Sequence, residues 1–106
     1  MIGLMVMLAG AGAVVQDARC SAAIEFNQEP QAMIDNPDMA MKIAEIYLTK
    51  FYGAKVMKGE VPLRVSLQGD VWHLTGKDLP TGSVGGVAEI DLCRTNGQVL
   101  RVVHGE

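Results

Sequence analysis

Basic side chains are scarce in this chain of 106 residues, and no run of like charge occurs in it. Nine Lys and Arg against twelve Asp and Glu leave a formal net charge of -3 at pH 7. Nucleic-acid-binding domains usually carry a basic patch and a strong basic excess. The charge balance therefore argues against a nucleic-acid-binding protein, and no charged tail suits a membrane surface.

Motifs of metal and catalytic sites are also missing from the sequence. The chain has no Cys-x-x-Cys pair, no cluster of Cys and His, and no His-Glu-x-x-His, so we expect no metal site. It has neither the Gly-x-Ser-x-Gly of a serine nucleophile turn nor the Gly-x-Gly-x-x-Gly of a dinucleotide cradle. We therefore expect no cofactor.

Only two cysteines are present, Cys20 and Cys93, and they leave two interpretations open. In an oxidising compartment they would form one disulfide that closes a long loop and stabilises the fold. The alternative is a pair of unrelated thiols, one near the N-terminal segment and one near the end of a strand.

The longest uncharged run, Ile2–Val15, is rich in Met, Leu, Val, Ala and Gly. About 20 apolar residues are needed to span a bilayer, so this run is too short for a transmembrane helix. Its length suits a secretory signal peptide, and Ala11-Gly12-Ala13 supplies the small-x-small pattern that signal peptidase requires. We expect a signal peptide over 1–18, export to the periplasm, and no stable membrane span after processing. A buried apolar segment is the alternative.

A helix signal follows the mixed-polarity segment 19–35, which we expect to be a linker or a loosely docked arm. Asn36 is a favourable N-cap, and Pro37 is tolerated at the first helical position because its missing N–H has no intrahelical partner there. Gly53 suits the residue just beyond a helix C-terminus, so we predict a helix over 37–52. The residues expected on its apolar stripe are Met39, Ala40, Ile43, Ala44, Tyr47 and Phe51, with Ile46 and Leu48 widening it.

Alternating apolar and polar residues after this helix predict an antiparallel meander. The expected strands are 63–68, 71–75, 84–93 and 98–104, with a further short strand at 54–57. Asn96-Gly97 is a strong hairpin signal because both residues tolerate positive φ. Gly85-Gly86 indicates a strand entry where the backbone bends or approaches another segment closely.

One helix followed by a meander is an α+β arrangement. We predict a single domain over 36–106, in which one main helix packs on a four-stranded antiparallel sheet. The helix should bury Ile43, Tyr47 and Phe51 against one sheet face. That face is expected to carry Trp72, Ala88, Ile90 and Leu92, with Trp72 as a core anchor rather than a ligand platform.

His73 and His104 are the only histidines of the chain. A general acid–base pair would use both of them, with Asp91 or Glu89 as the orienting carboxylate. The alternative interpretation is that each histidine lies at the surface or at the end of the sheet.

Four of the polar residues are expected on the sheet face away from the helix: Glu89, Asp91, Arg101 and His73. Across the Asn96-Gly97 turn, Asp91 and Arg101 would lie close enough to pair. One interpretation is a solvated face with a weak cross-strand ion pair. The other is a protein-docking surface, on which charge complementarity sets partner choice and association rate.

The stretch from Pro37 to Glu106 also carries a family pattern. Its motifs are Ala40-x-x-Ile43-Ala44-Glu45-x-Tyr47 with Tyr52-Gly53, Pro62-Leu63-x-Val65-x-Leu67, Asp70-Val71-Trp72, Leu79-Pro80-x-Gly82, Gly85-Gly86-Val87-Ala88-x-Ile90, Asn96-Gly97-x-Val99-Leu100 and His104-Gly105. In these the chain resembles immunity proteins of bacterial polymorphic toxin systems, which have the nuclear-transport-factor-two-like (cystatin-like) fold. The motifs are turn glycines, a strand tryptophan and an aromatic helix end, so they are specific for the fold.

The resemblance implies a function by binding. Immunity proteins bind a cognate toxin and block it, and this family implies no catalytic residues and no cofactor. We therefore expect a protein that neutralises a cognate bacterial toxin by protein–protein contact and is not an enzyme. The alternative is a small-ligand-binding or enzymatic envelope protein of the same broad fold.

Overall fold

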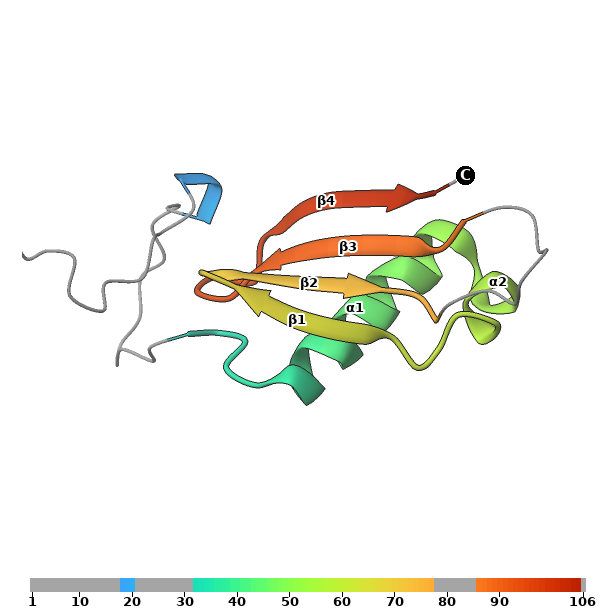
Figure 1. Ribbon diagram of the computed structural model, residues 1–106, viewed down its shortest axis with the longest axis horizontal. Helices are drawn as coiled ribbons and strands as arrows, with labels where there is room; N and C mark the ends of the chain where they lie inside the picture. The colour runs from blue at the N-terminus through green and yellow to red at the C-terminus, as the bar shows by residue number, and fades with distance from the viewer. Residues whose placement is uncertain (1–17, 21–31, 78–85, 106) are drawn as a thin grey trace, which may run out of the picture.

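The computed structural model describes residues 18–20, 32–77 and 86–105. Its elements are η2 (Ala18–Cys20), α1 (Pro37–Tyr52), α2 (Ala54–Lys58), β1 (Arg64–Gln68), β2 (Val71–Thr75), β3 (Ala88–Cys93) and β4 (Val99–His104). The four strands form one antiparallel sheet in the order β1-β2-β3-β4, and α1 crosses behind it (Figure 1). The predicted α+β fold, with one main helix on a four-stranded antiparallel sheet, is confirmed.

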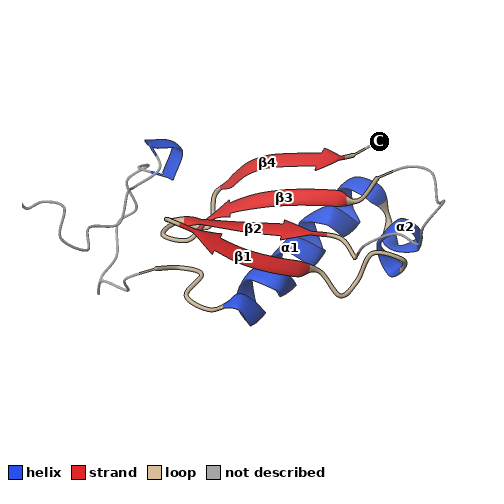
Figure 2. Ribbon diagram, viewed as in Figure 1, coloured by secondary structure: helices blue, strands red, loops and turns tan. Residues whose placement is uncertain are grey.

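Helix α1 forms one layer and the four strands form the other, as the colouring of Figure 2 shows. Within the described ranges, no helix has the length and apolar character that a membrane crossing requires. The predicted signal peptide falls on residues 1–17 and the first residue of η2, so nearly all of it lies outside the described residues.

Both ends of α1 lie where the sequence predicts them. The Asn36 side chain accepts a hydrogen bond from the Met39 backbone N–H at 2.9 Å, and Pro37 occupies the first helical position. At the other end, the Gly53 N–H donates to the Thr49 carbonyl at 2.7 Å. Gly53 then leaves the helix with φ of 90°, a conformation that side-chain-bearing residues rarely adopt.

The buried side of α1 differs from the prediction. Ala40, Ala44 and Leu48 are fully buried, whereas Tyr47 and Phe51 are 38% and 61% exposed. Apolar residues cover more than half of the helix circumference, so their periodicity alone does not fix which side faces the sheet. The two alanines decide it, because their small side chains let the helix backbone approach the sheet closely. The bulky aromatic rings then project beside the contact.

The predicted short strand at 54–57 is wrong, since these residues form the helix α2. Five residues are too few to separate a helical period from a strand period. The Met57 N–H donates to the Gly53 carbonyl at 3.1 Å, and the Met57 side chain is buried. The helical turn is therefore favoured because it places Met57 in the core.

The third strand is shorter than predicted. Residues 84 and 85 lie outside the described residues, and β3 begins at Ala88. A Cβ added at Gly86 would overlap the backbone of Gly105, so the chain passes very close to the end of β4 at this point. The predicted close approach is thus confirmed at Gly86, and the absence of a side chain there is what allows it.

The sheet face predicted to pack against the helix is the buried one. Leu74, Ala88, Ile90 and Leu92 are fully buried, and they belong to one cluster with the buried row of α1. Trp72 is also buried in this cluster, which confirms it as a core anchor.

The core extends beyond the predicted start of the domain at residue 36. Ile34 is fully buried, and its N–H donates to the Arg94 carbonyl at 3.0 Å. The Trp72 indole Nε1 donates to the Ile34 carbonyl at 2.9 Å. The last residues of segment 19–35 are therefore fixed to the body of the domain.

Replacing Trp72 with Ala should lower the free energy of unfolding by about 3 kcal/mol or more, as removal of a large buried aromatic does. Trp72→Phe is the control: it retains an aromatic ring but leaves the Ile34 carbonyl without its donor, which should cost about 1–2 kcal/mol. Urea unfolding measures both variants. A loss below about 1 kcal/mol for Trp72→Ala would contradict the anchoring role.

Candidate functional site: the open face of the sheet

The sheet face that points away from α1 is called the open face here. Because strand side chains alternate, it carries every second residue of the four strands. The registers place Ser66 opposite His73, His73 opposite Asp91, and Asp91 opposite Arg101. These four residues form one straight row across the sheet. Glu89 lies on the same face, two residues from Asp91 along β3.

Contacts join the four predicted residues of this face into a closed network. His73 Nδ1 is hydrogen-bonded to Asp91 Oδ1 at 2.5 Å, and His73 Nε2 lies 3.9 Å from Glu89 Oε1. Arg101 Nη1 donates to Glu89 Oε1 at 3.1 Å and lies 3.9 Å from Asp91 Oδ2. The predicted pairing of Asp91 with Arg101 is present, but the closer partner of Arg101 is Glu89. Each side chain thus holds two others in place.

The network lies between core and solvent. The Asp91 side chain is 15% exposed and that of Arg101 is 42% exposed. Ion pairs at this degree of exposure contribute about 0–1 kcal/mol to stability. These ion pairs therefore add little to the stability of the fold. Their main physical effect is to hold charged groups in fixed positions at the surface.

The structure does not bring the two histidines together, so of the two interpretations of the sequence the acid–base pair has no geometric basis. His73 lies on the open face, whereas His104 lies opposite Ala88, which is on the α1 side. Strand alternation separates them. The partner of His104 is Glu60, whose Oε2 lies 2.9 Å from His104 Nε2.

Ser66 stands next to His73 in the register and completes the order Ser–His–Asp across the sheet. Within the described residues, however, no hydrogen bond joins the Ser66 hydroxyl to His73, whose free Nε2 turns toward Glu89. A serine nucleophile needs that bond to lose its proton to the base. The row therefore does not have the geometry of a catalytic triad.

Glu60 is a buried carboxylate that the sequence analysis missed. Its Oε1 accepts a hydrogen bond from the Ala88 N–H at 2.7 Å, and its Oε2 contacts His104. A Cβ at Gly76 would overlap Glu60 Oε1, so this glycine makes room for the carboxylate. The Tyr52 ring packs on His104 with centroids 5.1 Å apart. The cluster ties α1, the segment before β1 and the ends of three strands together.

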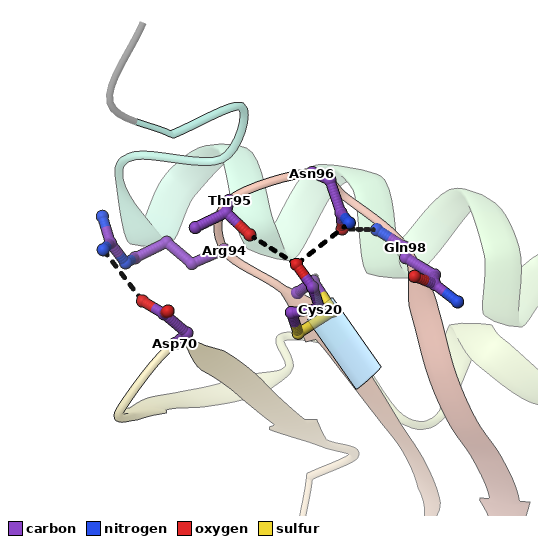
Figure 3. The surroundings of a disulfide bond; sticks show 7 residues. Cys20, Asp70, Arg94, Thr95, Asn96 and Gln98 are labelled. Carbon is purple, nitrogen blue, oxygen red and sulfur yellow. Dashed lines mark hydrogen bonds and ion pairs between the residues drawn. A yellow bond between two sulfur atoms is a disulfide. The ribbon is translucent and has the colours of Figure 1, made fainter. Parts of the chain in front are cut away.

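Cys20 and Cys93 form a disulfide across a sequence separation of 73 residues. Figure 3 shows Thr95 and Asn96 beside it, and both side chains donate to the Cys20 carbonyl at 3.4 Å. Cys93 lies opposite Val71, on the open face. The bond therefore holds η2 at one end of that face.

The turn that follows Cys93 is held from a second side as well. Arg94 Nη2 donates to Asp70 Oδ1 at 2.9 Å, and the Asp70 side chain is almost completely buried (Figure 3). The backbone N–H of Arg94 also donates to the Asp70 carbonyl at 2.7 Å. The β1–β2 turn and the β3–β4 turn are thus locked together beside the disulfide.

Metal binding finds no support in the side-chain arrangement. Among residues 18–20, 32–77 and 86–105, no three His, Cys, Asp or Glu side chains are placed to hold a metal ion.

A family model described as "NTF2 fold immunity protein" matches residues 39–106, a range that includes every strand and nearly all of α1. The chain belongs to this family of NTF2 fold immunity proteins. The match confirms the resemblance found in the sequence motifs. It also covers His73, Glu89, Asp91 and Arg101, so the open face lies within the family domain.

Two curated proteins of Escherichia coli (strain K12) are similar to the chain. "Uncharacterized protein YbbC" is 35% identical over 68 residues, which cover 64% of this chain and 56% of that protein. "Uncharacterized protein YhhH" is 27% identical over 74 residues, which cover 70% of this chain and 58% of that protein. The chain thus spans little more than half the length of these relatives. No solved structure gives a significant match.

Replacing Cys20 with Ser should lower the free energy of unfolding by roughly 4 kcal/mol, the chain-entropy value for a loop of this size. Urea unfolding under oxidising conditions measures the change. A reducing agent should destabilise the wild-type protein by a similar amount and leave Cys20→Ser unaffected. Equal unfolding midpoints for the oxidised wild type and the variant would show that the bond does not constrain the fold.

Proposed function

We propose that this protein binds a cognate bacterial toxin and neutralises it by protein–protein contact, without catalysing a reaction. The observation that carries the proposal is the match of residues 39–106 to the NTF2 fold immunity proteins. The open face supports a binding role, because its charged side chains hold one another in fixed positions at a surface.

The docking surface in this proposal is the open face around His73, Glu89, Asp91 and Arg101. Adjacent strands hold these side chains, and their mutual contacts fix the position of each charge before a partner arrives. Preordered side chains lose less conformational entropy on binding. Their mixed charges would select a toxin surface with the complementary pattern and speed its approach.

Export to the periplasm is part of the proposal. The Cys20–Cys93 disulfide supports it, because disulfides persist in oxidising compartments and are rare in the reducing cytoplasm. The uncharged run Ile2–Val15 supports it from the sequence side. Processing near Val14 or Arg19 would retain Cys20 in the mature chain.

A second candidate function is the binding of a small ligand on the same face. A depression of about 300 Å³ lies beside the network, lined by Arg64, Val65, Ser66, His73 and Thr75. It is small and only partly enclosed, whereas typical ligand pockets enclose most of the molecule they bind. Toxin binding is therefore the preferred function.

Reversing two charges of the open face, with Glu89→Lys and Asp91→Lys together, should slow association with the toxin at least about tenfold at low salt. The probe is a toxin domain sought among the genes beside this one in its native genome. Binding to it is measured by surface-immobilised binding kinetics and by growth protection on co-expression. Circular dichroism checks that the variant is folded.

The matched control is Asp35→Lys with Glu45→Lys, which makes the same change in net charge away from the open face. It should leave association nearly unchanged. Equal association rates for both double variants would place the docking surface elsewhere. Failure of the wild-type protein to bind or protect against that toxin would argue against the immunity function itself.

The N-terminus of the exported protein gives a separate test of localisation. Mass spectrometry of the protein recovered from the periplasm should find a chain that begins near Val14 or Arg19 and carries an oxidised cysteine pair. An intact Met1 in a cytoplasmic product with two free thiols would contradict the export proposal.

A further inference from the structure

The depression beside the charged network lies over β1 and β2, and its volume is about 300 Å³. Its lining includes Arg64 and Ser66 from β1 and His73 and Thr75 from β2. The register sets Arg64 opposite Thr75 and Ser66 opposite His73, so these four residues stand at the corners of one small rectangle. Val65 also lines the depression and packs against the core, which makes this part of the surface firm.

The side chains around the depression are rich in hydrogen-bond donors. A guanidinium carries five N–H donors and a permanent positive charge, and the hydroxyls of Ser66 and Thr75 each add one donor. Arg64 is exposed and already takes part in an interaction within the chain. Its fork of five donors can hold a further acceptor at the same time.

The carboxylates of the open face lie beyond His73, over β3. Arg101 donates to Glu89 Oε1 at 3.1 Å and lies 3.9 Å from Asp91 Oδ2, so β4 supplies the cation beside both of them. His73 Nδ1 is hydrogen-bonded to Asp91 as well. The open face is therefore divided into a donor-rich half over β1 and β2 and a carboxylate-bearing half over β3 and β4.

We propose that the depression receives an Asp or Glu side chain of the toxin, whose carboxylate meets the Arg64 guanidinium and the hydroxyls of Ser66 and Thr75. The proposal rests on the toxin-binding function proposed above and specifies the chemistry of the partner. A carboxylate fits because its two oxygens accept two parallel N–H bonds from one guanidinium. A small, partly enclosed depression suits a single side chain that enters from a protein surface.

A single carboxylate suits the site better than a row of phosphates. Glu89 lies opposite Thr75, one strand beyond the depression, and with Asp91 and the net charge of -3 it would repel a nucleic-acid backbone. Arg64 and Glu89 are two strands apart, which is roughly 10 Å across a sheet. The matching toxin surface should therefore carry a basic residue roughly 10 Å from its acidic one, to meet the carboxylate-bearing half.

Replacing Arg64 with Ala should weaken toxin binding at least about tenfold, mainly through faster dissociation, because the carboxylate of the toxin would lose its charged partner. Arg64→Lys should recover only part of the loss, since an ammonium cannot form the paired bonds. The probe is the toxin domain sought among the neighbouring genes, and surface-immobilised binding kinetics measure both rates. Lys42→Ala, which removes one exposed positive charge from α1, is the matched control and should leave both rates nearly unchanged.

Thr75→Val tests the depression without changing a charge. The substitution keeps the size and the β-branched shape of the side chain, so the fold should be retained while one donor is lost. Dissociation of the toxin should become at least about fivefold faster, because hydrogen bonds to a charged group are among the stronger ones. Circular dichroism and urea unfolding check that this variant and the Arg64 variants are folded.

Charge exchange tests the acidic partner directly. Arg64→Glu should weaken binding at least about a hundredfold, and Lys in place of the contacting Asp or Glu of the toxin should restore a large part of it. Each exposed Asp and Glu of the toxin is replaced by Lys in turn and measured against Arg64→Glu. Wild-type affinity in a folded Arg64→Ala variant, or no rescue by any of these toxin variants, would overturn the assignment of the depression alone. Failure of the wild-type protein to bind the toxin would overturn the toxin-binding function and this proposal with it.

Discussion

The single layer of helix is the constraint on which the rest of this structure depends. One helix, α1, covers one face of a four-stranded sheet, and its row of Ala40, Ala44 and Leu48 brings it close to that face. The sheet has no second helical layer among the described elements, and the side chains of its other face, apart from Cys93, are partly or fully exposed. The polar network of the open face is the consequence. His73, Asp91 and Arg101 stand in one row because the strand pleat and the hairpin registers leave them no other position.

A thin two-layer domain also needs its ends fixed, and two clusters do this. At one end the β3–β4 turn binds the β1–β2 turn through Arg94 and Asp70, and it binds η2 through the disulfide at Cys93. At the other end the buried Glu60 holds the Ala88 N–H and His104. Both clusters join segments that are far apart in the sequence. They keep the four strands in register, and the geometry of the open face depends on that register.

Sequence patterns predicted what depends on neighbours along the chain. The ends of α1 follow from Asn36 and Gly53, and the placement of His73, Glu89, Asp91 and Arg101 on one face follows from alternation and the Asn96-Gly97 turn. The rotation of α1 was missed because its apolar arc is too wide to select one side, and only packing of the alanines does so. Glu60 and its bond to His104 were missed because no local pattern links residues 44 positions apart. The pairing of Cys20 with Cys93 stayed open for the same reason.

The two surfaces left by this architecture have opposite chemistry, and that difference suits them to different partners. The open face carries ordered charges, which attract a complementary surface over a distance and are sensitive to salt. The exposed side of α1 carries apolar side chains such as Ile46 and Phe51, which act only on contact. Because the sheet separates them, occupation of one surface leaves the other accessible.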